Sequence, residues 1–88
     1  NNGQISVAVA IDAGGNIAGD PVMQTQGVPI EDERDEFFDE AIDAARKATK
    51  KFDGDIEKLR ENVRLAVRRT AREWTGKKPI VDVLVVEA

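Results

Sequence analysis

The 88-residue sequence contains no histidine, no cysteine and no tyrosine, and its only serine is Ser6. Nucleophilic triads that depend on histidine therefore cannot be built from this chain. Zinc sites made of His or Cys are excluded as well, and no disulfide can form. Carboxylates are plentiful, but their placement on the predicted helices is typical of solvated faces and local ion pairs. We therefore predict that the chain is not an enzyme by itself and holds no catalytic, metal or cofactor site.

Long hydrophobic runs are also missing. No apolar stretch approaches the roughly 20 residues that a membrane-spanning helix needs, and no signal peptide is visible. Together with the lack of cysteine, this favours a cytoplasmic protein without membrane contact. The chain opens with Asn1 rather than Met, so we expect residues 1–88 to be a single domain from a longer protein. The net charge of −4 argues against a dedicated nucleic-acid binder.

What is present is a set of clear periodic patterns. Bulky and small residues alternate over Ile5–Ile11, which predicts a strand with one bulky face. A second, weaker strand is predicted within Ile17–Val28, and Pro21 indicates that it lies at a sheet edge. The β-branched run Ile80–Val86 predicts the last strand.

Two amphipathic helices are predicted between the second and last strands. The first runs from about Asp32 to Lys51. Its predicted buried stripe is Phe38, Ala41, Ile42, Ala45, Ala48 and Phe52, with Phe37 at the margin. The second begins after Asp55 as N-cap and ends at Gly76, and Pro79 prevents a restart. Its predicted buried stripe is Ile56, Leu59, Val63, Ala66, Val67, Thr70 and Trp74.

The element order is therefore β-β-α-α-β. Because the connection between the helices is short, they should be antiparallel neighbours. We predict an α/β (α+β) two-layer sandwich, with a three-stranded mixed sheet and both helices on one face. The first and last strands are the most apolar and should be adjacent, which gives the spatial order 2-1-3 with the last strand parallel to the first.

One candidate functional surface is the sheet face that the helices do not cover. If Val81, Val83 and Val85 point at the helices, alternation turns the intervening residues outward. The predicted interface residues are Ala8, Ala10, Ile80, Leu84 and Val86. Small and apolar residues on an uncovered face favour docking to the rest of a longer protein or self-association as a homo-oligomer.

The other candidate surface is basic. Arg64, Arg68 and Arg72 recur every four residues after Arg60, and Lys77 and Lys78 follow the helix. Such a row could follow an RNA phosphate backbone. The alternative, which we favour at this point, is that acidic residues of the first helix balance the row within the chain. The expected partners are Asp35, Asp39 and Asp43. The lack of interleaved aromatic residues also weakens the RNA interpretation.

The ordered features resemble a known family. Gly19-Asp20-Pro21, the Gln26-Gly27-Val28 exit and the run from Thr75 through Gly76-Lys77-Lys78-Pro79 to Val81 are similar to the C-terminal domain of ribonuclease J. The final Val85-Val86-Glu87 fits as well. Two departures stand out: Thr25-Gln26-Gly27-Val28 replaces a frequent Ser-Arg-Gly-Phe, and Val83 stands where a proline is common.

The resemblance implies a role inside a larger enzyme. Members join a metallo-β-lactamase core to a β-CASP insertion, bind two Zn²⁺ ions through His and Asp, and cleave RNA by 5′→3′ exonucleolytic and endonucleolytic action. They serve messenger RNA turnover and ribosomal RNA maturation. By resemblance, this chain is an accessory domain for oligomerisation and full activity. The alternatives are an RNA-guiding module and a docking site for a protein partner of the RNA-decay machinery.

Overall fold

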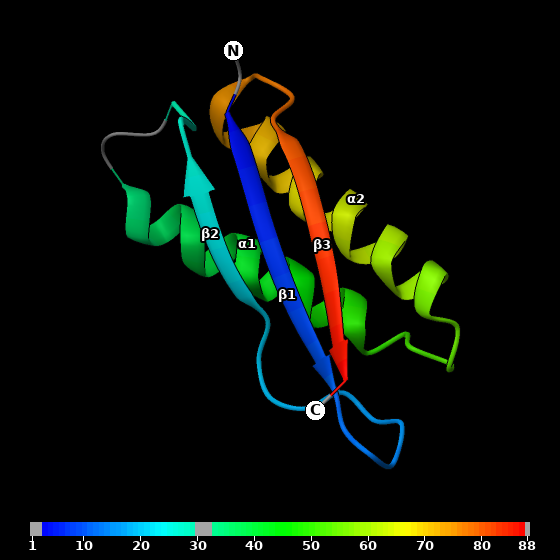
Figure 1. Cartoon of the computed structure of the whole chain (residues 1–88). Helices are drawn as coiled ribbons and strands as arrows, with labels where there is room; N and C mark the ends of the chain where they lie inside the picture. Colours follow the sequence, from blue (N-terminus) through cyan, green and yellow to red (C-terminus); the bar gives the residue numbers. More distant parts are fainter. Residues whose placement is uncertain (1–2, 30–32, 88) are drawn as a thin grey trace.

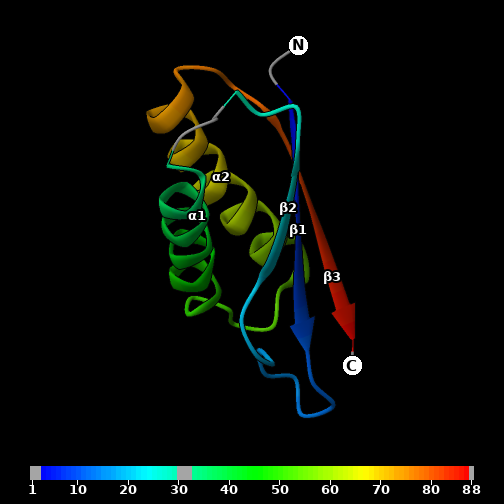
Figure 2. The same cartoon turned by 90° about the vertical axis from the view of Figure 1, so that its left-hand side faces the viewer.

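The chain folds into two layers, a three-stranded sheet and a pair of helices that cover one of its faces (Figures 1 and 2). A computed structural model describes residues 3–29 and 33–87. The elements are β1 (Gln4–Ile11), β2 (Val22–Gln26), α1 (Arg34–Thr49), α2 (Ile56–Thr75) and β3 (Ile80–Glu87). The predicted β-β-α-α-β order and two-layer α+β architecture are confirmed.

The sheet has the order β2-β1-β3. β1 runs antiparallel to β2 and parallel to β3, and the two helices form the crossover between the parallel strands. Ala8 of β1 pairs with Val22 on one side and with Leu84 on the other. The predicted strand order and the parallel orientation of the last strand are both confirmed.

The hydrophobic core lies between the sheet and the helices. It receives every second residue of β1, together with Met23 of β2 and Val81 of β3. The helices contribute Phe37, Ala41, Ala45, Ala48, Leu59, Val63, Val67 and Ala71. Within residues 3–29 and 33–87, no helix covers the opposite face of the sheet (Figure 2).

The ends of α2 are set by local hydrogen bonds, as the sequence predicts. The Asp55 carboxylate accepts the backbone N–H of Lys58 at 3.1 Å, which satisfies one of the free donors of the first turn. At the other end Gly76 has φ 70°, and its N–H donates to the Arg72 carbonyl. The chain then turns through the buried Pro79 into β3.

α1 differs in detail from the prediction. Its described part begins at Arg34 and ends at Thr49 rather than at Lys51, and the predicted start, Asp32, lies outside the described residues. The predicted burial of its two aromatic residues is reversed. Phe37 is 1% exposed and packs edge-on against Trp74, whereas Phe38 is only partly buried.

Phe37 lies on the buried side of α1. Phe37 is four residues before Ala41, which is four before Ala45, so all three point towards the core. Phe38 is turned one step away, and the Arg34 guanidinium covers its ring at 5.4 Å from the centroid. Phe38 therefore closes the edge of the core instead of filling its centre.

Candidate functional site

The uncovered sheet face carries a continuous apolar patch. The β-ladder places Val22, Ala8 and Leu84 in one row across the three strands, and Ala10 and Val86 form the next row. We call these five residues the outer apolar patch. Val22 is 62% exposed, Leu84 63% and Val86 43%. The outward direction that alternation predicts for β1 and β3 is therefore confirmed, while a role in binding stays a prediction.

Ile80 is on the same face but apart from this patch. The row between them consists of Gln24, Ser6 and Asp82, all polar and exposed. The Gln4 side chain donates a hydrogen bond to the Asp82 carboxylate within this polar region. Alternation along β3 places Ile80 with the other candidate interface residues. It does not show which residues of β1 and β2 lie between them.

Val22 belongs to the patch, although sequence reasoning did not identify it. The sequence places the second strand only within Ile17–Val28 and gives no register for it against β1. Asp12 closes the turn after β1, since its carboxylate accepts the N–H groups of Gly14 and Asn16, and Ile11 then bridges Ile17. The pairing of Ala8 with Val22 is shifted by two residues from that bridge, so the turn by itself does not set the register of β2.

The arginine row lies on the side of α2 that faces β3, away from α1. Arg64 and Arg68 line a hollow with Lys78, Pro79 and Ile80, where β3 begins, and Val81 completes the lining. Arg64 is held by its own helix, since Glu61 accepts two hydrogen bonds from it at 2.9 and 2.6 Å. This contact lowers the pKa of the Glu61 carboxyl and raises that of the Arg64 guanidinium.

The prediction that Asp35, Asp39 and Asp43 balance the arginine row is therefore wrong. Asp43 pairs with Arg46 and Lys47 of its own helix, and the Lys47 contact lowers the pKa of the Asp43 carboxyl. Among the described residues, neither Asp35 nor Asp39 forms an ion pair with α2. The arginine row and these aspartates face different neighbours, because α1 packs on one flank of α2 and β3 on the other.

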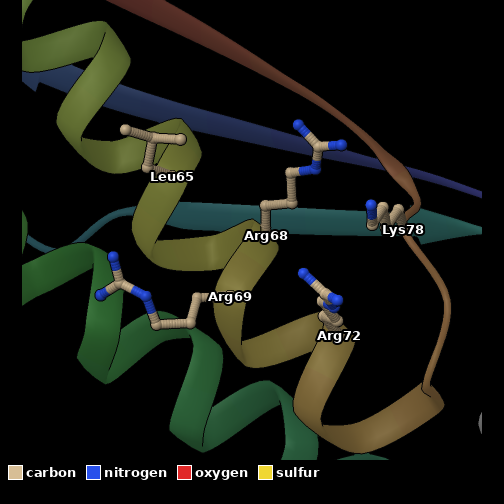
Figure 3. Close-up of a pocket in the computed structure, with 5 residues that line it drawn as sticks. All are labelled: Leu65, Arg68, Arg69, Arg72 and Lys78. Carbon is tan, nitrogen blue, oxygen red and sulfur yellow. The ribbon is translucent and has the colours of Figure 1, made fainter.

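The last turns of α2 carry cations that form no ion pair with any residue the structure describes. Leu65, Arg68, Arg69, Arg72 and Lys78 line a hollow of about 330 Å³, which we call the cationic hollow (Figure 3). Within residues 3–29 and 33–87, neither these four cations nor Lys77 form an ion pair. Cations near a helix C-terminus complement its dipole, which accounts for part of this placement. Lys78 follows the end of α2, so the helix dipole does not explain why it lies beside these arginines.

Other kinds of site find no support in the part of the chain that the structure describes. Among the residues of that part, no group of three or more His, Cys, Asp or Glu is placed to hold a metal ion. No described helix is long and apolar enough to cross a membrane. The indole N–H of Trp74 is bound to the Glu40 carboxylate at 2.8 Å and serves the contact between the helices.

Fold and surfaces together define a small two-layer α+β domain that exposes the outer apolar patch and the cationic hollow. Comparison with known proteins gives the family. The family model of the ribonuclease J C-terminal domain matches residues 1–88, and the chain belongs to that family. It is also 32% identical over 90 residues to a ribonuclease J of Sinorhizobium meliloti (strain Sm2011 / Rm2011 / 2011). That match covers 97% of this chain and 16% of the relative.

Proposed function

We propose that this chain is a non-catalytic accessory domain of a cytoplasmic RNA-degrading enzyme and that it assembles the enzyme through the outer apolar patch. Cleavage and the Zn²⁺ ions that support it would belong to other parts of a longer protein. Two observations support this division. The match spans only 16% of the ribonuclease J relative, and the sequence has no histidine or cysteine.

The observation that carries the assembly role is the shape and composition of the outer apolar patch. Ala8 and Ala10 form a low strip on β1, between the larger Val22 of β2 and the larger Leu84 and Val86 of β3. None of the five residues is charged, which is typical of the centre of an interface. An uncovered sheet face of this kind can pack against another sheet at about 10 Å.

A second copy of the chain has the shape to pack against the outer apolar patch. In a two-fold arrangement each surface contacts its own equivalent. The ridge of Leu84 and Val86 on one copy can then lie over the alanine strip of the other, and the reverse contact forms at the same time. The polar row of Gln24, Ser6 and Asp82 would mark the rim of such an interface.

Replacing Leu84 with aspartate should weaken self-association without unfolding the domain. Leu84 is 63% exposed on an edge strand, so the folded monomer can solvate the new carboxylate. In the symmetric dimer two carboxylates would be buried without partners, and we expect the dissociation constant to rise about 100-fold. Sedimentation velocity over a wide concentration range measures this change, and thermal melting checks the fold.

Leu65→Asp is the matched control, because Leu65 is an exposed leucine (42%) on α2, away from the patch. It should leave self-association unchanged. An equal loss in both variants would contradict a patch-specific interface. A wild-type chain that stays monomeric at every concentration would also contradict self-assembly and would leave the rest of the longer protein as the occupant.

A further inference from the structure

We propose that the cationic hollow and the hollow beside it form a binding track for the phosphate backbone of single-stranded RNA. This site is distinct from the outer apolar patch and does not depend on self-assembly. Arg68 and Lys78 line both hollows, so the two adjoin. The combined surface extends along α2 from Arg64 to Arg72 and along the start of β3.

The geometry of the track suits a repeating anion. Residues four apart on an α-helix are displaced by about 6 Å along its axis, so Arg64, Arg68 and Arg72 present charges at regular intervals. Figure 3 shows Arg68, Arg72 and Lys78 grouped on the β3 side of the helix, while Arg69 extends towards α1. Lys78 is brought there by the Gly76 turn and the short connection to β3.

Most of the charge of the track is not balanced within the described chain. Arg64 pairs with Glu61, whereas Arg68, Arg69, Arg72 and Lys78 form no ion pair with any described residue. Among the described residues, no acidic residue lines either hollow. Several cations elsewhere do form ion pairs, Arg46 with Asp20 and Asp43, Lys58 with Asp53, and Arg60 with Glu57, although Lys50 and Lys51 form none among the described residues. Four cations that gather without a counter-ion repel one another, so an incoming anion gains from all of them.

The side chains also indicate which anion fits. Guanidinium groups match phosphate oxygens with paired N–H donors, and three of the four cations of the hollow are arginines. Among the described residues, Leu65 is the only apolar one that lines the cationic hollow, so this part of the track offers little anchorage for a protein segment; Pro79, Ile80 and Val81 line the adjoining hollow. No aromatic ring of the described residues lines the track, so binding should show little sequence preference. RNA is the polyanion that a ribonuclease family encounters as substrate.

The test is fluorescence anisotropy of a labelled single-stranded oligouridylate titrated with the 88-residue chain at several salt concentrations. The wild type should bind at low salt and lose affinity as salt rises. Arg68→Gln combined with Arg72→Gln removes two phosphate contacts and should weaken binding about tenfold at moderate salt. It should also reduce the slope of log affinity against log salt by about 0.7 per lost contact.

Lys58→Gln combined with Arg60→Gln is the matched control. It removes the same charge from the same helix, but at positions with acidic partners outside the track. RNA affinity should change little in this variant. The melting temperature of the Arg68/Arg72 variant should not fall below that of the wild type, since no described ion pair is lost and charge repulsion is reduced. If that variant does not fold, Arg69→Gln with Lys78→Gln replaces it.

Three results would overturn the proposal. The first is no RNA binding by the wild type at low salt. The second is an equal loss of affinity in the test and control variants, which would reflect net charge alone. The third is that poly-glutamate competes as strongly as unlabelled oligouridylate for the same arginines, which would identify an acidic protein segment as the occupant.

Discussion

Replacing Phe37 with alanine is expected to lower the free energy of unfolding by about 3–5 kcal/mol. Phe37 is 1% exposed, and its ring makes edge contacts with Phe38 and Trp74 at centroid distances of 5.9 and 6.1 Å. The remaining stripe of α1 is mostly alanine, so no neighbouring side chain can fill the cavity. Small domains have a low free energy of unfolding, so a decrease of this size should leave the chain close to unfolding.

Phe38→Ala is the matched comparison, because it removes the same ring one residue further along. Phe38 is partly buried and covered by Arg34. Its loss should therefore cost clearly less than the loss of Phe37. Urea unfolding followed by circular dichroism gives both values. A larger loss for Phe38→Ala would mean that α1 is rotated relative to the sheet.

The second large effect is expected at Gly3, where alanine should destabilise the domain by about 3 kcal/mol or more. Gly3 is buried and has φ 86°, a conformation that residues with a side chain rarely adopt. A Cβ there would lie 2.6 Å from the Gly27 carbonyl oxygen, and backbone cannot move aside as a flexible side chain can. The Gly3 carbonyl also accepts the N–H of Ile80, so the strain reaches the β1–β3 ladder.

Gly15→Ala separates the cost of the positive φ from the cost of the steric clash with Gly27. Gly15 has a similar φ of 80°, but nothing lies within 4 Å of the position that an alanine methyl group would take. The substitution should cost only the backbone strain, about 1–2 kcal/mol. Thermal melting of the two variants gives the comparison. Equal losses would show that the close approach of Gly3 to Gly27 does not form in solution.

Much of the fold could be predicted because its signals are local. Alternation in β1 and β3 decides which side chains face the helices, and the burial of Val81 together with the exposure of Leu84 agrees with that pattern. The N-cap at Asp55 and the left-handed Gly76 each depend on a few neighbouring residues. Strand order followed from the apolar character of the first and last strands.

The errors concern relations between elements. Helix periodicity places Phe37 and Phe38 only one step apart, and the position of Trp74 on the other helix decides which of them is buried. The separation of Ile80 from Leu84 depends on Ser6 and its partners in the sheet.

The arginine row shows the same limitation. An antiparallel helix pair brings the acidic start of α1 near the basic end of α2, but the sequence does not say which flank of α2 the arginines occupy. A spacing of four residues advances about 40° beyond a full turn, so successive arginines shift around the helix. In the structure Arg64 and Arg68 line a hollow with the start of β3, and among the described residues no acidic residue of α1 forms an ion pair with α2.

The most direct test of the assembly role is a dilution series of the wild-type chain followed by methyl NMR. We expect the methyl resonances of Ala8, Ala10, Val22, Leu84 and Val86 to shift together with concentration. Resonances of Leu65, on α2, and of the buried Val63 should stay in place. Concentration-dependent shifts at Leu65 with an unchanged outer apolar patch, or no shifts at all, would contradict the claim that this patch joins two copies of the domain.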